Sequence, residues 1–383
     1  MHALFDSLRS FIKPQSCVID NPIYQLHYKW TVLILLAFSV MVTARQYFGD
    51  PIECMGPAGV PPKLLDTFCW VHTTYSVEGA WRKRVGLDVV YPGVENSNGV
   101  REGRVYHTYY QWVCFVLFFQ ALAFWAPRFI WKMAEGGLTR NLVLGLNSPL
   151  LNGESREASI RLLTEYFTAN MHLHNGRFFT YAATETLNLL NVVLQMLMLD
   201  RFLGNQFSSY GTEVLKFTEW DEAVRFDPMI KIFPRMTKCD FYNFGASGSI
   251  ERKDALCLLP INVLNEKIFI FLWFWLYLLA VLSALTLLYR ALTIFIPALR
   301  VMALNSHCRL SNSRAIKQVL SKGSIGDWFM LDLLAKNMEA SNFKELIVRL
   351  KEKFETDADA ESLDLLKDKL NLLSEKLSFM EKR

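Results

Sequence analysis

One stretch of the chain limits its fold more than any other. Between Arg104 and Arg128 the sequence has 23 consecutive residues without a formal charge, and most of them are apolar. A helix of about 20 apolar residues crosses a hydrocarbon core of roughly 30 Å. Trp112 lies near one end of the stretch, and Arg128, Trp131 and Lys132 lie near the other. Interfacial aromatic rings and cations anchor spanning helices in this way, so we predict a transmembrane helix here.

Pro127 lies inside this predicted helix, which we place at residues 109–133. Proline has no N–H group and its ring crowds the carbonyl of Ala123, so we expect a kink. A static kink is the favoured interpretation, and a bend used in gating is the alternative. Inside a membrane the freed carbonyl needs a partner from neighbouring helices or water. The chain should therefore form a bundle of helices.

The composition agrees with a membrane protein and excludes some partners. Hydrophobic residues make up 52% of the chain and charged residues only 20%, below the roughly 25% of soluble proteins. The net charge is +4 and no block of Lys and Arg occurs, which argues against a nucleic-acid partner. The N-terminus lacks a secretory pattern, and the first long apolar run begins at Trp30, so we expect that run to remain as a span.

Three further apolar segments predict spans at residues 29–48, 178–199 and 267–290. The last has 22 uncharged residues between Lys267 and Arg290. After it, the chain is rich in Arg and Lys and has no acidic residue before Asp327. Cationic loops stay inside the cell, so residues 291–383 should be cytoplasmic. Four spans then place loops 49–108 and 200–266 outside and leave residues 1–28 and 134–177 inside.

The third predicted span carries a polar stripe. Thr184, Asn188, Asn191 and Gln195 share one helical face, with Glu185 beside it. Polar groups at membrane depth face protein or water and not lipid. Hydrogen bonds between helices are the favoured interpretation, and a water-lined surface is the alternative.

The seven cysteines are unevenly placed. Cys54 and Cys69 lie in loop 49–108, and Cys239 and Cys257 lie in loop 200–266. An even number in each of two outside loops favours disulfide bonds over free thiols. The spacings are far from those of zinc sites, so we expect no metal and no cofactor.

The two ends of the chain show amphipathic patterns. Residues 2–12 place Leu4, Phe5, Leu8, Phe11 and Ile12 on one face of a short helix. This helix either lies on the membrane surface or folds into a pore mouth, and the pattern alone favours the surface. In the tail, one helical stripe is followed by a short heptad pattern, which predicts packing on neighbouring cytoplasmic helices rather than an independent coiled coil. The stripe is Phe343, Leu346, Ile347, Leu350 and Phe354, and the heptad residues are Leu363, Leu366, Leu370, Leu373, Leu377 and Met380.

Over about residues 1–335 the sequence resembles the innexins, the gap-junction family of invertebrates. Tyr109, Tyr110, Gln111, Trp112 and Val113 match the family signature at the start of the second span, and Pro127 lies at the family's proline position. Other matching stretches are Gly49-Asp50-Pro51-Ile52 with the four loop cysteines, residues 266–276, and Gly326-Asp327-Trp328-Phe329.

The resemblance implies a fold and an assembly. The fold would be an all-α membrane protein with four transmembrane helices, a helical cytoplasmic region, and small β elements in two disulfide-tied outer loops. Subunits, alone or mixed with other innexins, would form a ring of eight in preference to six in the plasma membrane. Rings of adjacent cells would dock through these loops. The implied disulfide pairs are Cys54–Cys257 and Cys69–Cys239.

The resemblance also implies that the N-terminal segment folds into the pore, which reverses the preference from pattern alone. Met1, His2, Asp6 and Ser10 are then the candidates for the narrowest lining, and titration of His2 could contribute to closure on acidification. The expected function is passive diffusion of ions and small metabolites. Alternatives are a non-docking channel, a structural adhesion protein and a membrane enzyme. For an enzyme the spans offer only Glu185 and Cys114, with His107 nearby, and no metal spacing. The chain has no N-x-[ST] glycosylation sequon, which favours docking.

Overall fold

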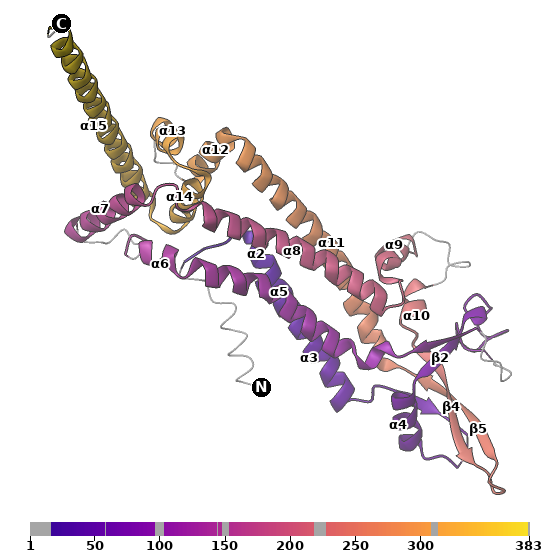
Figure 1. The fold of residues 1–383 in the computed structure, drawn as a ribbon. Helices are drawn as coiled ribbons and strands as arrows, with labels where there is room; N and C mark the ends of the chain where they lie inside the picture. Colours follow the sequence, from indigo (N-terminus) through magenta and orange to yellow (C-terminus); the bar gives the residue numbers. More distant parts are fainter. Residues whose placement is uncertain are drawn as a thin grey trace. The chain divides into compact units, whose positions relative to one another are not determined.

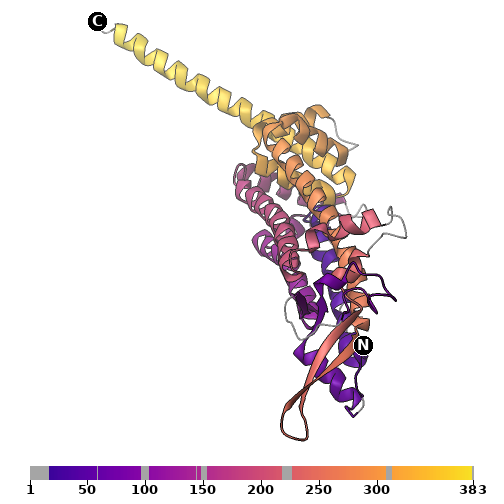
Figure 2. The ribbon, with the colours of Figure 1, turned by 90° about the vertical axis from the view of Figure 1, so that its right-hand side faces the viewer.

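The computed structural model describes residues 17–57, 59–95, 103–143, 145–147, 153–217, 227–307 and 313–381. These residues belong to two compact units, which we describe separately. The first unit takes its residues from 23–127 and 187–284, and the second from 17–22, 128–186 and 285–381. Figures 1 and 2 show the elements from two sides. The candidate pore-lining residues Met1, His2, Asp6 and Ser10 lie outside the described residues.

In the described part of the chain, four helical segments are long and apolar enough to cross a membrane. The first is continuous over Pro22–Phe48 and consists of α2 (Pro22–Gln25), a π-helix η1 (Leu26–Thr31) and α3 (Val32–Phe48). The others are α5 (Val113–Glu135), α8 (Asn175–Phe202) and α11 (Pro260–Phe295). The membrane fold predicted from the sequence is therefore confirmed.

The ends of these helices differ from the predicted limits of the spans. The first segment begins at Pro22 and not near residue 29, and α11 begins at Pro260 and not near 267. Proline is favoured at the first position of a helix, where its missing N–H has no helical partner. Residues Tyr109–Gln111 form a 3-10 turn, η3, so α5 starts only at Val113 and then continues through Pro127 to Glu135. Helical hydrogen bonding does not stop where apolar composition stops, which explains the longer helices.

The spanning helices have one buried and one exposed face. Leu35 and Val42 of α3, Leu117 of α5, and Leu272 and Leu276 of α11 are buried in the core of the first unit. Large apolar side chains also lie on the exposed faces of the helices, among them Phe118, Phe119, Leu122, Leu194 and Val281. An apolar exterior of this size suits a lipid environment.

The two long loops of the first unit form one antiparallel sheet of five strands, in the order β1-β5-β4-β2-β3 (Figure 1). Strands β1 (Glu53–Met55), β2 (Thr74–Val77) and β3 (Arg104–His107) come from loop 49–108. Strands β4 (Met236–Phe244) and β5 (Ile250–Leu258) come from loop 200–266 and pair along their full length. At nine residues each, β4 and β5 are longer than the small β elements we expected.

The same loops contain helices that the sequence pattern did not predict. They are α4 (Pro62–His72), the 3-10 turn η2 (Glu78–Ala80), α9 (Phe207–Phe217) and α10 (Pro228–Ile232). Gly211 allows α9 to approach α11 closely, because a Cβ atom there would lie 2.2 Å from the ring of Trp273. The absence of a side chain at this position is therefore a packing requirement.

The second unit is helical in its described part. Besides the ends of α5, α8 and α11, it contains α6 (Leu138–Leu142), α7 (Gly153–Ala169), α12 (Pro297–His307), α13 (Ser313–Lys322), α14 (Ile325–Asn337) and α15 (Ala340–Glu381). The stripe Phe343, Leu346, Ile347 and Leu350 is buried, as its spacing predicts. Leu366, in the predicted heptad pattern, is 59% exposed in the single chain, so its packing on neighbouring cytoplasmic helices stays a prediction.

Candidate functional site

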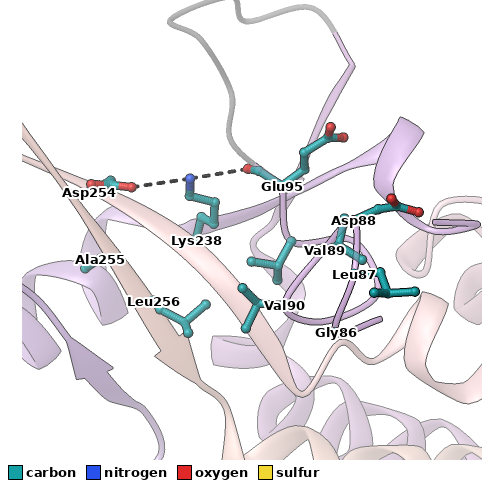
Figure 3. Close-up of a pocket in the computed structure, with 11 residues that line it drawn as sticks. Gly86, Leu87, Asp88, Val89, Val90, Glu95, Lys238, Asp254, Ala255 and Leu256 are labelled. Carbon is teal, nitrogen blue, oxygen red and sulfur yellow. Dashed lines mark hydrogen bonds and ion pairs between the residues drawn. The ribbon is translucent and has the colours of Figure 1, made fainter. Parts of the chain in front are cut away.

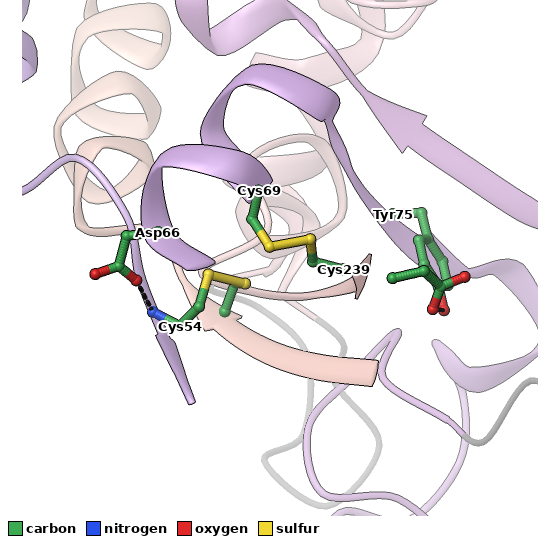
Figure 4. The surroundings of a disulfide bond; sticks show 7 residues. Cys54, Asp66, Cys69, Tyr75 and Cys239 are labelled. Carbon is green, nitrogen blue, oxygen red and sulfur yellow. Dashed lines mark hydrogen bonds between the residues drawn. A yellow bond between two sulfur atoms is a disulfide. The ribbon is translucent and has the colours of Figure 1, made fainter. Parts of the chain in front are cut away.

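Two disulfide bonds join the two long loops of the first unit. Cys54 on β1 is bonded to Cys257 on β5, and these residues are also register partners in the sheet. Cys69 on α4 is bonded to Cys239 on β4, and Asp66 of α4 accepts a hydrogen bond of 2.7 Å from the amide of Cys54 (Figure 4). The structure thus contains the pairs that the family resemblance implies. Strand pairing and two covalent bonds make one platform of loops 49–108 and 200–266.

A buried charge cluster ties four strands of this platform together. Asp240 on β4 is 2.9 Å from Arg104 on β3 and 3.0 Å from Arg252 on β5. It also accepts a hydrogen bond of 2.9 Å from the hydroxyl of Tyr75 on β2. Burial by itself raises the pKa of Asp240, but these hydrogen bonds outweigh it and lower that pKa below its usual value. Asp240 is therefore a charged centre with two cations, and such a network resists deformation of the sheet.

A hollow lies between the loop at residues 86–95 and strands β4 and β5 (Figure 3). Lys238 of β4 crosses it, donating a hydrogen bond of 3.3 Å to the Glu95 carbonyl and pairing at 3.4 Å with Asp254. The lining combines the apolar residues Leu87, Val89, Val90, Val94 and Leu256 with the charged residues Asp88, Glu95, Lys238 and Asp254. Lys238 thus holds the loop against the sheet.

The signature at residues 109–113 joins the platform to the spanning helices of the first unit. The side-chain amide of Gln111 donates to the carbonyl of Trp70 at the end of α4, and the rings of Tyr110 and Trp70 are 4.8 Å apart. Tyr109 contacts Phe233 edge-on at 5.5 Å, next to α10. Burial raises the pKa of Tyr109 well above its usual value and that of Tyr110 to about 12. Both hydroxyls therefore stay neutral at physiological pH.

The other two signature residues have opposite surroundings. Val113 is fully buried in the core of the first unit, whereas Trp112 is 60% exposed. An exposed indole beside the start of an apolar helix is typical of a membrane interface, in agreement with the predicted anchor.

In the second unit, a buried ion pair connects α8 and α11. Glu185 accepts two hydrogen bonds of 2.8 Å from the guanidinium of Arg290, and a third of 2.8 Å from the side-chain amide of Asn21. The guanidinium lies 5.1 Å from the ring centre of Tyr181 and 6.0 Å from that of Phe329. These bonds and ring contacts compensate the two buried charges.

The motif Gly326-Asp327-Trp328-Phe329 fastens α14 to neighbouring segments of the second unit. Asp327 is 2.7 Å from Nδ1 of His174, and it accepts hydrogen bonds from Ser324, where it completes a capping box. The amide of Gly326 donates to the side chain of Asn175, and Trp328 donates to the carbonyl of Arg300. Burial by itself raises the pKa of Asp327, but the hydrogen bonds outweigh it and lower that pKa to about 2.

Two residues that were predicted to anchor the helix at the membrane surface are buried in protein instead. Arg128 pairs at 2.7 Å with Asp20, and both side chains are buried. Trp131 is 1% exposed and donates a hydrogen bond to the carbonyl of Ile19. Both residues face protein because a chain segment before α2 supplies their polar partners. Only Lys132 of the predicted inner anchors is exposed.

The polar stripe of the third span is mostly buried within the chain. Thr184, Asn188 and Gln195 are each at most 5% exposed, so a water-lined surface is wrong for these three residues. Thr184 donates to the Tyr181 carbonyl, and Gln195 donates to Asn191 at 3.3 Å. These two bonds lie within α8, and the predicted bonds between helices are made by Glu185 beside the stripe, which accepts from Arg290 of α11.

Comparison with known proteins decides the family. The family model described as Innexin matches residues 20–354. The chain belongs to the innexin family. Curated relatives include the innexin inx2 of Schistocerca americana, 44% identical over 93% of this chain and 99% of that protein. The innexin inx2 of Drosophila melanogaster is 43% identical over 93% of this chain and 97% of its own length. The innexin shaking-B of the same species is 41% identical over 90% of this chain and 92% of its own length.

Family membership settles the general role of this innexin. Innexins are subunits of invertebrate gap-junction channels and form oligomers, so the chain is a multi-pass membrane protein of a channel-forming family. The sequence analysis missed the polar contacts made by residues 18–21. One signal was available: Asp20 before the first span and Arg128 near the inner end of the second were both predicted on the cytoplasmic side, where opposite charges can pair.

Proposed function

We propose that this innexin is the subunit of a large-pore gap-junction channel that passes ions and small metabolites between adjacent cells by passive diffusion. Rings of eight subunits, in preference to six, dock across the intercellular gap through loops 49–108 and 200–266. The rings lie in the plasma membrane and contain this chain alone or with other innexin subunits. Both termini are cytoplasmic, in accord with the cations that follow the fourth span.

The observation that carries the docking proposal is the construction of the platform. Strands from both loops form one sheet, Cys54–Cys257 and Cys69–Cys239 cross-link it, and Asp240 on β4 binds cations from β3 and β5. A docking surface gains affinity when its parts are ordered before contact, because less conformational entropy is lost on binding. A channel that only releases molecules into the medium has no such requirement.

The pore proposal concerns the N-terminal segment. Met1, His2, Asp6 and Ser10 line the narrowest part, and protonation of His2 contributes to closure on acidification. A His2→Ala channel whose conductance keeps the same pH response would contradict the role of His2. A static kink at Pro127 remains the favoured interpretation, and a bend used in gating is the alternative. If the alternative holds, a Pro127→Ala channel should differ from wild type in open probability.

Paired-cell recording tests the proposed function. Cells expressing the wild-type chain should show junctional current and transfer of a small dye. The variant Cys69→Ser/Cys239→Ser should lose junctional current, because the platform is no longer cross-linked at α4. The variant Cys114→Ser is the matched control, since this cysteine is buried but not disulfide-bonded. Current across the single membrane with none between wild-type cells would support the non-docking channel instead.

A further inference from the structure

Residues Val18–Asn21 form an irregular segment of the second unit directly before α2, and we call this segment the strap. Each of its four residues is bound by a side chain from a different position of the unit. The strap is the last part of the chain between the N-terminal segment and the first spanning helix. Its attachment therefore fixes the backbone directly before α2.

The first attachment is to the end of α14. The side-chain oxygen of Asn337 accepts a hydrogen bond of 2.6 Å from the Val18 amide, and its nitrogen donates one of 2.7 Å to the Val18 carbonyl. A side-chain amide that binds both polar groups of one peptide residue acts like a strand partner. This pair of bonds fixes both the position and the orientation of the backbone at Val18.

The second and third attachments are to α5. The indole N–H of Trp131 donates a hydrogen bond of 3.0 Å to the Ile19 carbonyl, and Arg128 pairs at 2.7 Å with Asp20. Trp131, Arg128 and Asp20 are all buried. A buried charge or carbonyl that loses its partner is costly, so these bonds strongly oppose release of the strap.

The fourth attachment is to α8. The hydroxyl of Tyr181 accepts a hydrogen bond of 3.1 Å from the Asn21 amide, and the Asn21 side chain donates one of 2.8 Å to Glu185. Glu185 is itself held by Arg290 of α11. The strap is therefore joined directly to α14, α5 and α8, and through Glu185 to α11.

We infer that Asn337, acting with Trp131 through the strap at Val18–Asn21, is a positioning residue for the N-terminal segment of the pore. The inference rests on the proposed function, in which residues 1–12 line the pore. A displacement of α14 moves Asn337, and because Asn337 binds the Val18 backbone directly, it moves the base of the N-terminal segment with it. The strap thus gives the cytoplasmic helices a covalent and hydrogen-bonded route to the pore lining.

The test measures how accessible the N-terminal segment is. A reporter cysteine, Ser10→Cys, is placed in a background with Cys17→Ser and Cys308→Ser, and a membrane-impermeant methanethiosulfonate is applied to the cytoplasmic face of excised patches. The rate at which current falls reports access to residue 10. Adding Asn337→Ala should raise this rate at least fivefold, and Trp131→Phe, which removes one N–H and keeps a ring, should raise it about threefold.

A matched variant separates positioning from general loss of stability. Asn342 is a buried asparagine of the same unit whose side chain donates a hydrogen bond of 3.0 Å to the Leu146 carbonyl and does not bind the strap. Asn342→Ala should leave the modification rate within twofold of the reporter alone. Rings of all variants are compared by size-exclusion chromatography, and Asn337→Asp replaces Asn337→Ala if the latter does not assemble.

Three results are distinguishable. A faster reaction in the Asn337 and Trp131 variants, with Asn342→Ala unchanged, supports the inference. Unchanged rates in assembled Asn337 and Trp131 variants, with current still blocked by the reagent, overturn the inference and leave the proposed pore intact. If modification of the reporter leaves the current unchanged in every background, residue 10 does not line the pore, and that part of the proposed function fails together with the inference.

Discussion

Arg290 and Glu185 form a two-point ion pair between α11 and α8, with Nε and Nη2 each 2.8 Å from a carboxylate oxygen. Both side chains are buried, at 10% and 3% exposure. Parallel bonds between a guanidinium and a carboxylate are strong and directional. The pair fixes the relation of the two helices in the second unit and leaves each charge dependent on the other.

Removing one partner of this pair should destabilise the protein more than removing both. Glu185→Leu leaves Arg290 buried without its carboxylate, which we expect to cost about 3 kcal/mol or more. The double variant Glu185→Leu/Arg290→Met removes both charges and should recover much of that loss. Recovery of stability stays incomplete because the side-chain amide of Asn21 still lacks its acceptor on Glu185. Thermal unfolding in detergent measures the effect, and a double variant no better than Glu185→Leu would contradict the interpretation.

The sequence predicted the spanning helices well because their signal is local. The uncharged run after Arg104 and the one after Lys267 need no knowledge of distant residues. The sheet was underestimated for the opposite reason: β1 pairs with β5 across about 200 residues, and no short pattern encodes such a pairing. The disulfide pairs came from family resemblance, since cysteine spacing alone leaves the connectivity open.

The partners of the polar side chains in the second unit could not be predicted from one sequence, for another reason. Arg128 and Trp131 have the residue types of membrane anchors, and Arg290 counts as one of the cations after the fourth span. In the structure Arg128 and Arg290 pair with carboxylates, and Trp131 binds the strap. A charge pattern predicts the side of the membrane on which a residue lies, but it does not predict the partner that the residue finds there.

Each disulfide should contribute a definite share of stability to the platform. With Cys69–Cys239 intact, the bond Cys54–Cys257 closes only the segments 54–69 and 239–257, about 33 residues in all. Chain-entropy arguments give about 4 kcal/mol for a loop of this size. The variant Cys54→Ser/Cys257→Ser should therefore unfold at a lower denaturant concentration than wild type. Loss of both bonds should lower the free energy of unfolding by clearly more than twice as much as loss of either one. The reason is that either bond, when it is the only one present, closes a much longer loop.

Gly326→Ala should destabilise the second unit. A Cβ atom at Gly326 would lie 2.3 Å from the backbone nitrogen of Asn175 and from the backbone carbon of His174, and backbone atoms cannot move aside easily. We expect a loss of about 2 kcal/mol or more. Gly176→Ala is the matched control, since a Cβ there meets nothing within 4 Å. Alanine also favours a helix, so this control should be neutral or stabilising by less than about 1 kcal/mol. Equal unfolding temperatures of the two variants would contradict the close-packing argument.

A buried histidine makes the platform sensitive to acid. His107 at the end of β3 is 5% exposed, and its Nε2 is 2.8 Å from the hydroxyl of Ser76. Burial lowers the pKa of His107 from 6.5 to about 4. The unfolded chain therefore binds a proton below pH 6.5 that the folded chain does not bind until about pH 4. Stability from neutral His107 is complete above pH 6.5 and is lost progressively as the pH falls from 6.5 to 4.

His107→Gln should remove this part of the pH dependence. The lowered pKa corresponds to a loss of about 3 kcal/mol between pH 6.5 and 4, since one pKa unit is worth about 1.4 kcal/mol. The unfolding temperature of the wild-type protein in detergent should thus fall more steeply over this range than that of His107→Gln, although glutamine should start lower at pH 7. His72→Gln is the control, because His72 is an exposed histidine of the same loop. In this variant the unfolding temperature should fall with pH as steeply as in the wild-type protein. If His107→Gln and the wild-type protein lose the same stability on acidification, another group causes the effect, and burial of His107 does not make the platform acid-sensitive.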